Sequence, residues 1–228
     1  MQTLLSEIYG DEVGRETWGR LQELMAAYRA RLPQGQTAVL SAQDAILITY
    51  ADQVQEEERP FLPTLTDFSQ AHLQGVVSAI HLLPFYPASS DDGFSVIDYR
   101  QVRPDLGDWA NITRLGQQFR LMFDAVINHI SAQSDWFRAF LRDDARYREY
   151  FTVVEPSADL TAVFRPRALP LLTEVATAVG PKHVWTTFSP DQIDLNYRNP
   201  NVLLDVVETL LFYVAQGAEF IRLGAIAF

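Results

Sequence analysis

Four short apolar runs divide the chain, each rich in Ile, Leu, Val and Phe. They are AILITYAD, AIHLLPFYP, RLMFDAVINH and AEFIRLGAIAF, at residues 45–52, 79–87, 120–129 and 218–228. Runs of this length and composition are typical of strands buried on both faces. The segments between them carry helical patterns, which predict helices at residues 66–78, 109–119, 135–150 and 199–216. Strands that alternate with helices predict an α/β fold with a parallel sheet.

Two helical patterns have further features. Apolar residues recur at helical spacing over residues 3–32, with a break near Gly10, and the Pro-Gln-Gly sequence at 33–35 ends the pattern. This predicts an N-terminal helical extension. The helix at 199–216 is expected to place its apolar residues on one shared face: Val202, Leu203, Val206, Val207, Leu210, Leu211 and Val214.

The stretch 153–188 has no clear periodicity and holds four prolines. It is too long for a simple connector, so it predicts an inserted irregular lobe after the third strand. The expected division of the chain is a helical extension (1–43), a first βα part (44–150), the lobe (151–190), and a last helix and fourth strand (191–228). Polar residues gather after the strands, where βα folds place their sites: Asp52, the loop after Pro87, Asn128, His129 and Arg222.

Composition narrows the class of protein. The 228 residues carry a net charge of −11, which argues against nucleic acid as a partner because phosphate contact favours a basic face. There is no cysteine, so disulfide scaffolds and thiolate metal sites are excluded, and a cytoplasmic protein is expected. The start of the chain does not resemble a secretory signal, and no apolar stretch reaches about 18 residues, so no membrane partner is expected.

The last apolar run contains an arginine and a glycine two positions apart, on the same side of the predicted strand. Burying Arg222 costs free energy unless it meets an anion or a ring of acceptors. It therefore either pairs with a carboxylate for structural reasons or serves a ligand site, and the pattern favours neither. A glycine inside a strand leaves space, so Gly224 alone indicates a close backbone approach or a bulge.

The third apolar run also contains polar residues, in the sequence FDAVINH at residues 123–129. On a continuous strand, Asp124 and Asn128 would point one way and His129 the other. Asn128 and His129 then either satisfy nearby backbone groups, or Asn128 organises a loop while His129 donates to a ligand. The four histidines lack metal-ligand spacing, so no metal is expected.

Two loops offer groups that recognise small polar ligands. DDGF places a carboxylate, Asp91, three residues before an aromatic ring, Phe94. Sugars are bound by such a pair, although these residues alone favour a turn with a capping Asp and a core Phe. RPRALP at 165–170 is a rigid basic loop, which alone is more simply a solvated charge.

These segments together resemble the α-amylase superfamily, glycoside hydrolase family 13. DAVINH and IRL-x-A match two of its signatures, and HLLPFYP, SSDDGFSVIDYR and VWTTFSPDQIDLNYR resemble its sucrose phosphorylase branch. ITYADQ, RALPLLT and DQIDLNYR look most like the glucosylglycerate phosphorylases of that branch. The resemblance implies a (β/α)8 TIM barrel with a lobe inserted after the third strand. Such a barrel has eight strands, so this chain is expected to be its N-terminal half, strands 1–4.

The resemblance also assigns expected roles to individual residues. Asp91 matches the carboxylate that binds glucose hydroxyls, Phe94 the aromatic platform, and His129 the donor-site histidine. Gln192 and Arg167 match positions near the acceptor side, where phosphate and the second substrate alternate. The expected partners are therefore a glucoside and inorganic phosphate. No cofactor is expected, and no calcium, because the phosphorylase branch generally lacks that ion.

Arg222 matches the arginine beside the catalytic nucleophile, an Asp two residues later in the family. Gly224 stands at that position and cannot attack the anomeric carbon. The family's acid/base Glu lies on a fifth strand. The resemblance thus implies that the chain descends from retaining hexosyltransferases that form α-glucose 1-phosphate. It also implies that the chain itself is inactive.

Two other functions remain open. The chain could be a non-catalytic sugar-binding or regulatory remnant, or an unrelated TIM-barrel phosphate enzyme. The second is disfavoured because there is no Gly-rich phosphate loop. Outer strands of half a barrel would be open edges, so self-association is also expected.

Overall fold

The computed structural model describes residues 1–33, 40–164 and 166–226, so Gln34, Gly35, Arg165 and Phe228 of the segments discussed above lie outside it. Its central feature is a parallel sheet in the order β1-β2-β3-β8. The strands are β1 (Ile46–Thr49), β2 (Ala79–Leu82), β3 (Arg120–Val126) and β8 (Ala218–Gly224). All three pairings are parallel, which confirms the fold class predicted from the four apolar runs.

The helices between the strands are α3 (Phe61–His72), α4 (Trp109–Gly116), α5 (Asp135–Leu141) and α6 (Pro200–Ala215). α3 lies earlier than the predicted 66–78, because Pro60 precedes its first turn and residues 74 and 77 already form a bridge. α4 begins after Asp108, which forms a capping box with Asn111. α5 is shorter than predicted, since Asp143 adopts a left-handed φ of 59° that no helix continues through.

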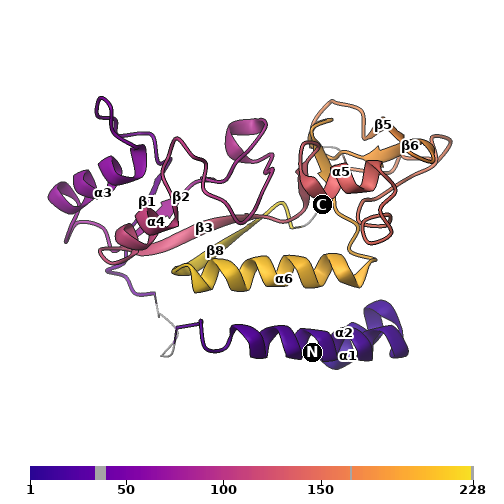
Figure 1. Ribbon diagram of the computed structural model, residues 1–228, viewed down its shortest axis with the longest axis horizontal. Coiled ribbons are helices and arrows are strands. Elements are labelled where there is room, and N and C mark those ends of the chain that lie inside the picture. Colours follow the sequence, from indigo (N-terminus) through magenta and orange to yellow (C-terminus); the bar gives the residue numbers. More distant parts are fainter. Residues whose placement is uncertain (34–39, 165, 227–228) are drawn as a thin grey trace.

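The N-terminal extension is a pair of helices, α1 (Gln2–Tyr9) and α2 (Asp11–Tyr28), and the predicted break falls at Gly10 with φ 83°. The two helices touch closely at Gly14, where a Cβ would lie 2.6 Å from the Cα of Ser6. They cover α6 on the side away from the sheet (Figure 1).

α6 is buried on two faces, so the prediction of one shared apolar face was wrong. Val202, Val206 and Tyr213 pack into the main core beneath the sheet. Leu204 packs instead against Leu5 and Leu21 of the N-terminal helices. The helix lies between two layers, and a single-face pattern does not describe such a helix.

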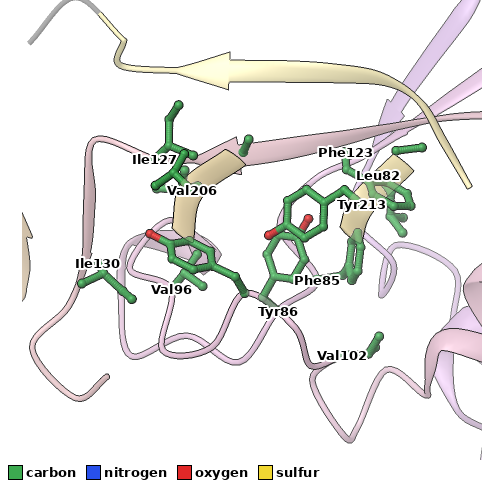
Figure 2. Close-up of a cluster of buried hydrophobic side chains, with 14 of the residues drawn as sticks. Leu82, Phe85, Tyr86, Val96, Val102, Phe123, Ile127, Ile130, Val206 and Tyr213 are labelled. Atoms are coloured by element: carbon green, nitrogen blue, oxygen red, sulfur yellow. The ribbon is translucent and has the colours of Figure 1, made fainter. Parts of the chain in front are cut away.

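The main core is strongly aromatic and lies between the sheet, α6 and the loops that follow β2 (Figure 2). Tyr86 stacks on Tyr213 with ring centroids 5.1 Å apart, and Phe85 meets Phe123 edge-on at 5.0 Å. Tyr86 also donates a hydrogen bond to the backbone of Asp124, at 3.2 Å. The core thereby fixes the segments that leave β2 and β3, which carry most of the candidate site residues.

The two outer strands are less buried than predicted. Ile48 on β1 is 62% exposed and Leu223 on β8 is 43% exposed, whereas all of β2 is buried. β1 and β8 form the edges of the described sheet, and each carries an exposed apolar side chain. The expectation of four strands buried on both faces therefore holds only for the inner pair.

The described residues between β3 and α6 form four further strands. β4 (His129–Ser131) pairs with β7 (Gln192–Asp194), and β5 (Leu172–Thr177) with β6 (Gly180–Trp185), both antiparallel. The strand predicted over 120–129 therefore ends at Val126, and His129 belongs to a different sheet. The predicted lobe includes a β-hairpin, so it is not irregular throughout. The four-part division of the chain stays a prediction.

Candidate active site

The loop after β2 carries Asp91 and Phe94 in an uncommon backbone conformation. A single 3-10 turn covers Asp91–Gly93, and Asp91, Asp92 and Gly93 have φ values of 55°, 50° and 96°. Left-handed φ is costly for residues other than glycine and is often found at functional sites. Gly93 is required sterically, because a Cβ there would lie 2.9 Å from the carbonyl oxygen of Pro84. The loop thus holds Asp91 in a defined place above the end of the strand.

Three separate parts of the chain meet at the Asp91 carboxylate. Gln192 on β7 donates from Nε2 to Oδ2 at 2.9 Å, and Arg167 of the lobe donates from Nη2 to Oδ1 at 3.2 Å. Gln192 is 1% exposed, whereas the Arg167 side chain is 45% exposed, so the amide is the firmer partner. Asp91, Gln192 and Arg167 are therefore brought together, as the sequence analysis expected of residues in one site.

His129 lies in the same group and is 4% exposed. Its Nε2 donates to the backbone oxygen of Phe94 at 3.0 Å, which makes Nδ1 the acceptor nitrogen. The Gln192 amide nitrogen lies 3.1 Å from this Nε2 and finds its acceptor in Asp91. Burial lowers the pKa of His129, so the imidazole is neutral at pH 7. Nδ1 is buried and has no hydrogen-bond partner among the described residues.

Aromatic rings border this group. The ring of Phe188 lies 5.2 Å from that of His129, and the Arg167 guanidinium lies over Phe188 at 5.9 Å. Phe94 is partly buried and packs against the main core. Phe188 did not stand out in the sequence, because its role depends on contacts between segments far apart in the chain.

A second polar group spans three neighbouring strands of the sheet, β2, β3 and β8. Arg222 donates from Nη1 to Oδ1 of Asp124 at 2.7 Å, and His81 Nε2 contacts Oδ2 of the same carboxylate at 2.7 Å. Asp124 and His81 are 1% and 3% exposed. Arg222 therefore pairs with a carboxylate, and its role in a ligand site stays a prediction. The arginine is not itself buried, since half of its side chain is exposed.

Sequence reasoning assigned no role to Asp124 or His81. A signal was present, because each is an ionisable residue inside an otherwise apolar inner strand, where an unpaired charge is costly. Tyr50, just after β1, was also missed. Its pKa is raised by burial and further by the carboxylates of Asp92 and Asp124.

Gly224 is not explained by local packing. A Cβ built there would meet no heavy atom within 4 Å, and the irregular register of β3 and β8 falls at residues 121–122. The expected close approach or bulge was therefore wrong. In the described part of the chain, no hydrogen bond or ion pair connects Arg222 or Gly224 with the Asp91 group.

Among residues 1–33, 40–164 and 166–226, no group of three or more His, Asp or Glu side chains is arranged to hold a metal ion. Within the same ranges, every helix is too short or too polar to cross a bilayer.

Comparisons with known proteins agree with the resemblance in the sequence. The family model described as the alpha-amylase catalytic domain matches residues 73–228, which is more than half of the chain. The glucosylglycerate phosphorylase of Spirochaeta thermophila is 51% identical over 234 residues and covers 100% of this chain. The sucrose phosphorylase of Streptococcus mutans is 31% identical over 80% of this chain.

The crystal structure of sucrose 6F-phosphate phosphorylase from Thermoanaerobacter thermosaccharolyticum superposes with a TM-score of 0.74 at 26% identity, over 84% of this chain and 41% of that one. The present chain spans about 40% of the length of the Spirochaeta and Streptococcus relatives. The partial (β/α)8 barrel predicted for strands 1–4 is confirmed by this similarity together with the parallel sheet.

Proposed function

The chain belongs to the α-amylase catalytic-domain family, and we propose that it carries the glucose-binding part of a retaining α-glucoside phosphorylase site. The substrates would be a glucoside, glucosylglycerate or sucrose, and inorganic phosphate. One observation carries the proposal: Asp91, Gln192, His129 and Arg167 come from distant segments and meet around one carboxylate.

The chemistry of this group suits a sugar. The Asp91 carboxylate can accept hydrogen bonds from neighbouring hydroxyls, and its two present partners hold it in orientation. His129 is neutral and buried, so it lies beside Asp91 without adding a charge to the group. Phe94 supplies an apolar surface, and the half-exposed Arg167 supplies a positive charge for phosphate.

The nucleophile is the group this chain lacks. A retaining mechanism requires a carboxylate that forms a covalent glucosyl intermediate. Gly224 has no side chain, although the space around it is open and Arg222 stands two residues away. We therefore propose that the 228-residue chain belongs to a phosphorylase lineage but transfers no glucosyl group itself.

A chimera with a relative tests this proposal. The segment of the Spirochaeta thermophila glucosylglycerate phosphorylase that aligns with this chain is replaced by the chain, once with Gly224 and once with Gly224→Asp. The Asp chimera should release glucose 1-phosphate from glucosylglycerate and phosphate at least about 10³-fold faster than the Gly chimera, since the attacking group is restored. Gly224→Asn is the matched control, because it fills the same space without a nucleophile. Equal rates for all three would refute the proposal.

A non-catalytic sugar-binding protein is the second candidate, favoured because the Asp91 group is present while residue 224 is not a carboxylate. Calorimetry of the 228-residue chain with glucose and glucose 1-phosphate separates the two. A phosphorylase lineage predicts no tight binding by this chain alone. Submillimolar binding that is lost in Asp91→Ala would favour the second candidate. The cytoplasmic location stays a prediction.

A further inference from the structure

One carboxylate outside the candidate site gathers an unusual number of serine hydroxyls. Oδ2 of Asp191 accepts from Ser89 and Ser90, both at 2.5 Å, and from Ser95 at 2.8 Å. Oδ1 accepts from Ser131 at 3.4 Å. Ser95 and Ser131 are fully buried. We call these five residues the serine clamp.

The clamp holds a carboxylate without a cation. Within the ranges that the structure describes, Asp191 takes part in no ion pair. Burial alone would raise the pKa of Asp191, but hydrogen bonds from the serine hydroxyls outweigh it and hold the pKa below its usual value. The carboxylate is therefore ionised at neutral pH, and Ser89, Ser90 and Ser95 donate to it in charge-assisted hydrogen bonds. The Ser131 hydroxyl lies 2.6 Å from that of Ser89 and is only a weak donor to Oδ1.

Four members of the clamp are near neighbours of candidate site residues. Ser90 precedes Asp91, Ser95 follows Phe94, Ser131 lies two positions after His129 on β4, and Asp191 precedes Gln192. The clamp thus joins the loop after β2, strand β4 and the start of β7, which together carry four of the candidate residues.

Backbone contacts tie the same three segments together. Ser131 N–H donates to the Val96 oxygen at 2.8 Å, and Ala132 N–H donates to the Asp191 oxygen at 2.9 Å. The Ser95 hydroxyl also reaches the Asp191 backbone oxygen at 3.1 Å. A shift of Asp191 would consequently move all three segments.

We propose that Asp191 is a positioning residue, whose serine-bound carboxylate sets the relative placement of Asp91, His129 and Gln192 for binding of the glucosyl group. This inference rests on the proposed function for the identity of the ligand. The loop's left-handed residues give a physical reason for such a device, because a costly backbone conformation persists only when neighbouring contacts hold it.

Two arms test the inference. In the 228-residue chain, Asp191→Ala should speed amide exchange at Ser95 and Ser131, while the amides of α6 stay unchanged. Asp159→Ala is the matched control, since the exposed Asp159 carboxylate accepts hydrogen bonds only from Thr161, two residues later, among the described residues. Unchanged exchange at Ser95 and Ser131 would overturn the inference. If Asp191→Ala does not fold, Ser131→Ala carries the same comparison at the amide of Ser95.

In the Gly224→Asp chimera, Asp191→Ala should lower kcat/KM by about 10²-fold, the scale expected for misplacement of binding groups by about 1 Å. Asp191→Asn keeps the shape of the side chain and an acceptor and should recover most of this loss. A general folding defect would instead lower the fraction of active chimera and leave KM unchanged. An Asp191→Ala chimera as active as its parent would refute the inference. An inactive Gly224→Asp chimera would instead refute the proposed function, and the exchange arm would still decide whether the clamp positions the loop.

Discussion

The Asp194 carboxylate on β7 should make the stability of the chain depend on pH in a way that one substitution can isolate. Asp194 is 7% exposed. Thr187 donates to it twice, from its hydroxyl and, at 3.3 Å, from its backbone N–H. Burial raises the pKa of Asp194 to about 6, and the Thr187 hydrogen bonds only partly oppose this. Asp194→Asn preserves the shape of the side chain and removes its ionisation.

The size of the effect follows from the shift in pKa. An Asp in the unfolded chain titrates near 4, so a native pKa of about 6 is a difference of about 2 units, or roughly 3 kcal/mol. The native state binds the proton more tightly than the unfolded state. The contribution is therefore fully present below about pH 4 and is lost as pH rises through about 6. An asparagine side chain at this position cannot titrate, so the Asp194→Asn variant should lack this loss.

Urea unfolding followed by circular dichroism at pH 4.5, 6.0 and 7.5 measures the effect. The free energy of unfolding of the wild-type chain, relative to that of Asp194→Asn, should fall by about 2 kcal/mol between pH 4.5 and 7.5, because part of the full contribution of about 3 kcal/mol is already lost at pH 4.5. Asp135→Asn is the control, because the Asp135 side chain is 96% exposed, and its curve should stay parallel to the wild type. A constant difference between wild type and Asp194→Asn would refute the reasoning.

Three further predictions follow from single features. Gly14→Ala should destabilise the chain by about 1–3 kcal/mol in thermal melts, because its Cβ would meet the Ser6 backbone at 2.6 Å. Gly19→Ala, on the same helix with open space around it, should be neutral or stabilising. Gly224→Asp in the 228-residue chain should fold and release no glucose 1-phosphate, because the described residues supply four barrel strands and the expected acid/base belongs to a fifth; measurable release would overturn that argument. Sedimentation should show self-association that Ile48→Lys, on an open edge strand, reduces; a monomeric wild type would contradict it.

The parallel sheet could be predicted from sequence because apolar runs and helical patterns alternate, and both are local signals. The path after β3 could not. Ile127 is apolar and Asn128 polar, as on a continuing strand, so nothing local showed that the chain leaves the sheet before His129. The second buried face of α6 was equally hidden, since it depends on helices almost 200 residues earlier in the chain.

The candidate site shows the same division. Asp91, Arg167 and Gln192 each had a plainer explanation when taken alone, and only the resemblance to a family joined them before the structure placed them in contact. The sequence pattern allowed for a carboxylate beside Arg222 but did not identify Asp124, because the partner lies 98 residues away on the neighbouring strand. The serine clamp had no local signal, since serine, aspartate and glycine in a loop are typical of ordinary turns.

The central claim is that this chain holds the glucose-binding part of a retaining phosphorylase and lacks its nucleophile at residue 224. The most direct measurement is the anomeric configuration of the product formed by the Gly224→Asp chimera from glucosylglycerate and phosphate, read by NMR. The account predicts α-glucose 1-phosphate from this chimera and no product from the chimera with Gly224. A β-configured product, or release by the Gly224 chimera at the same rate, would contradict it.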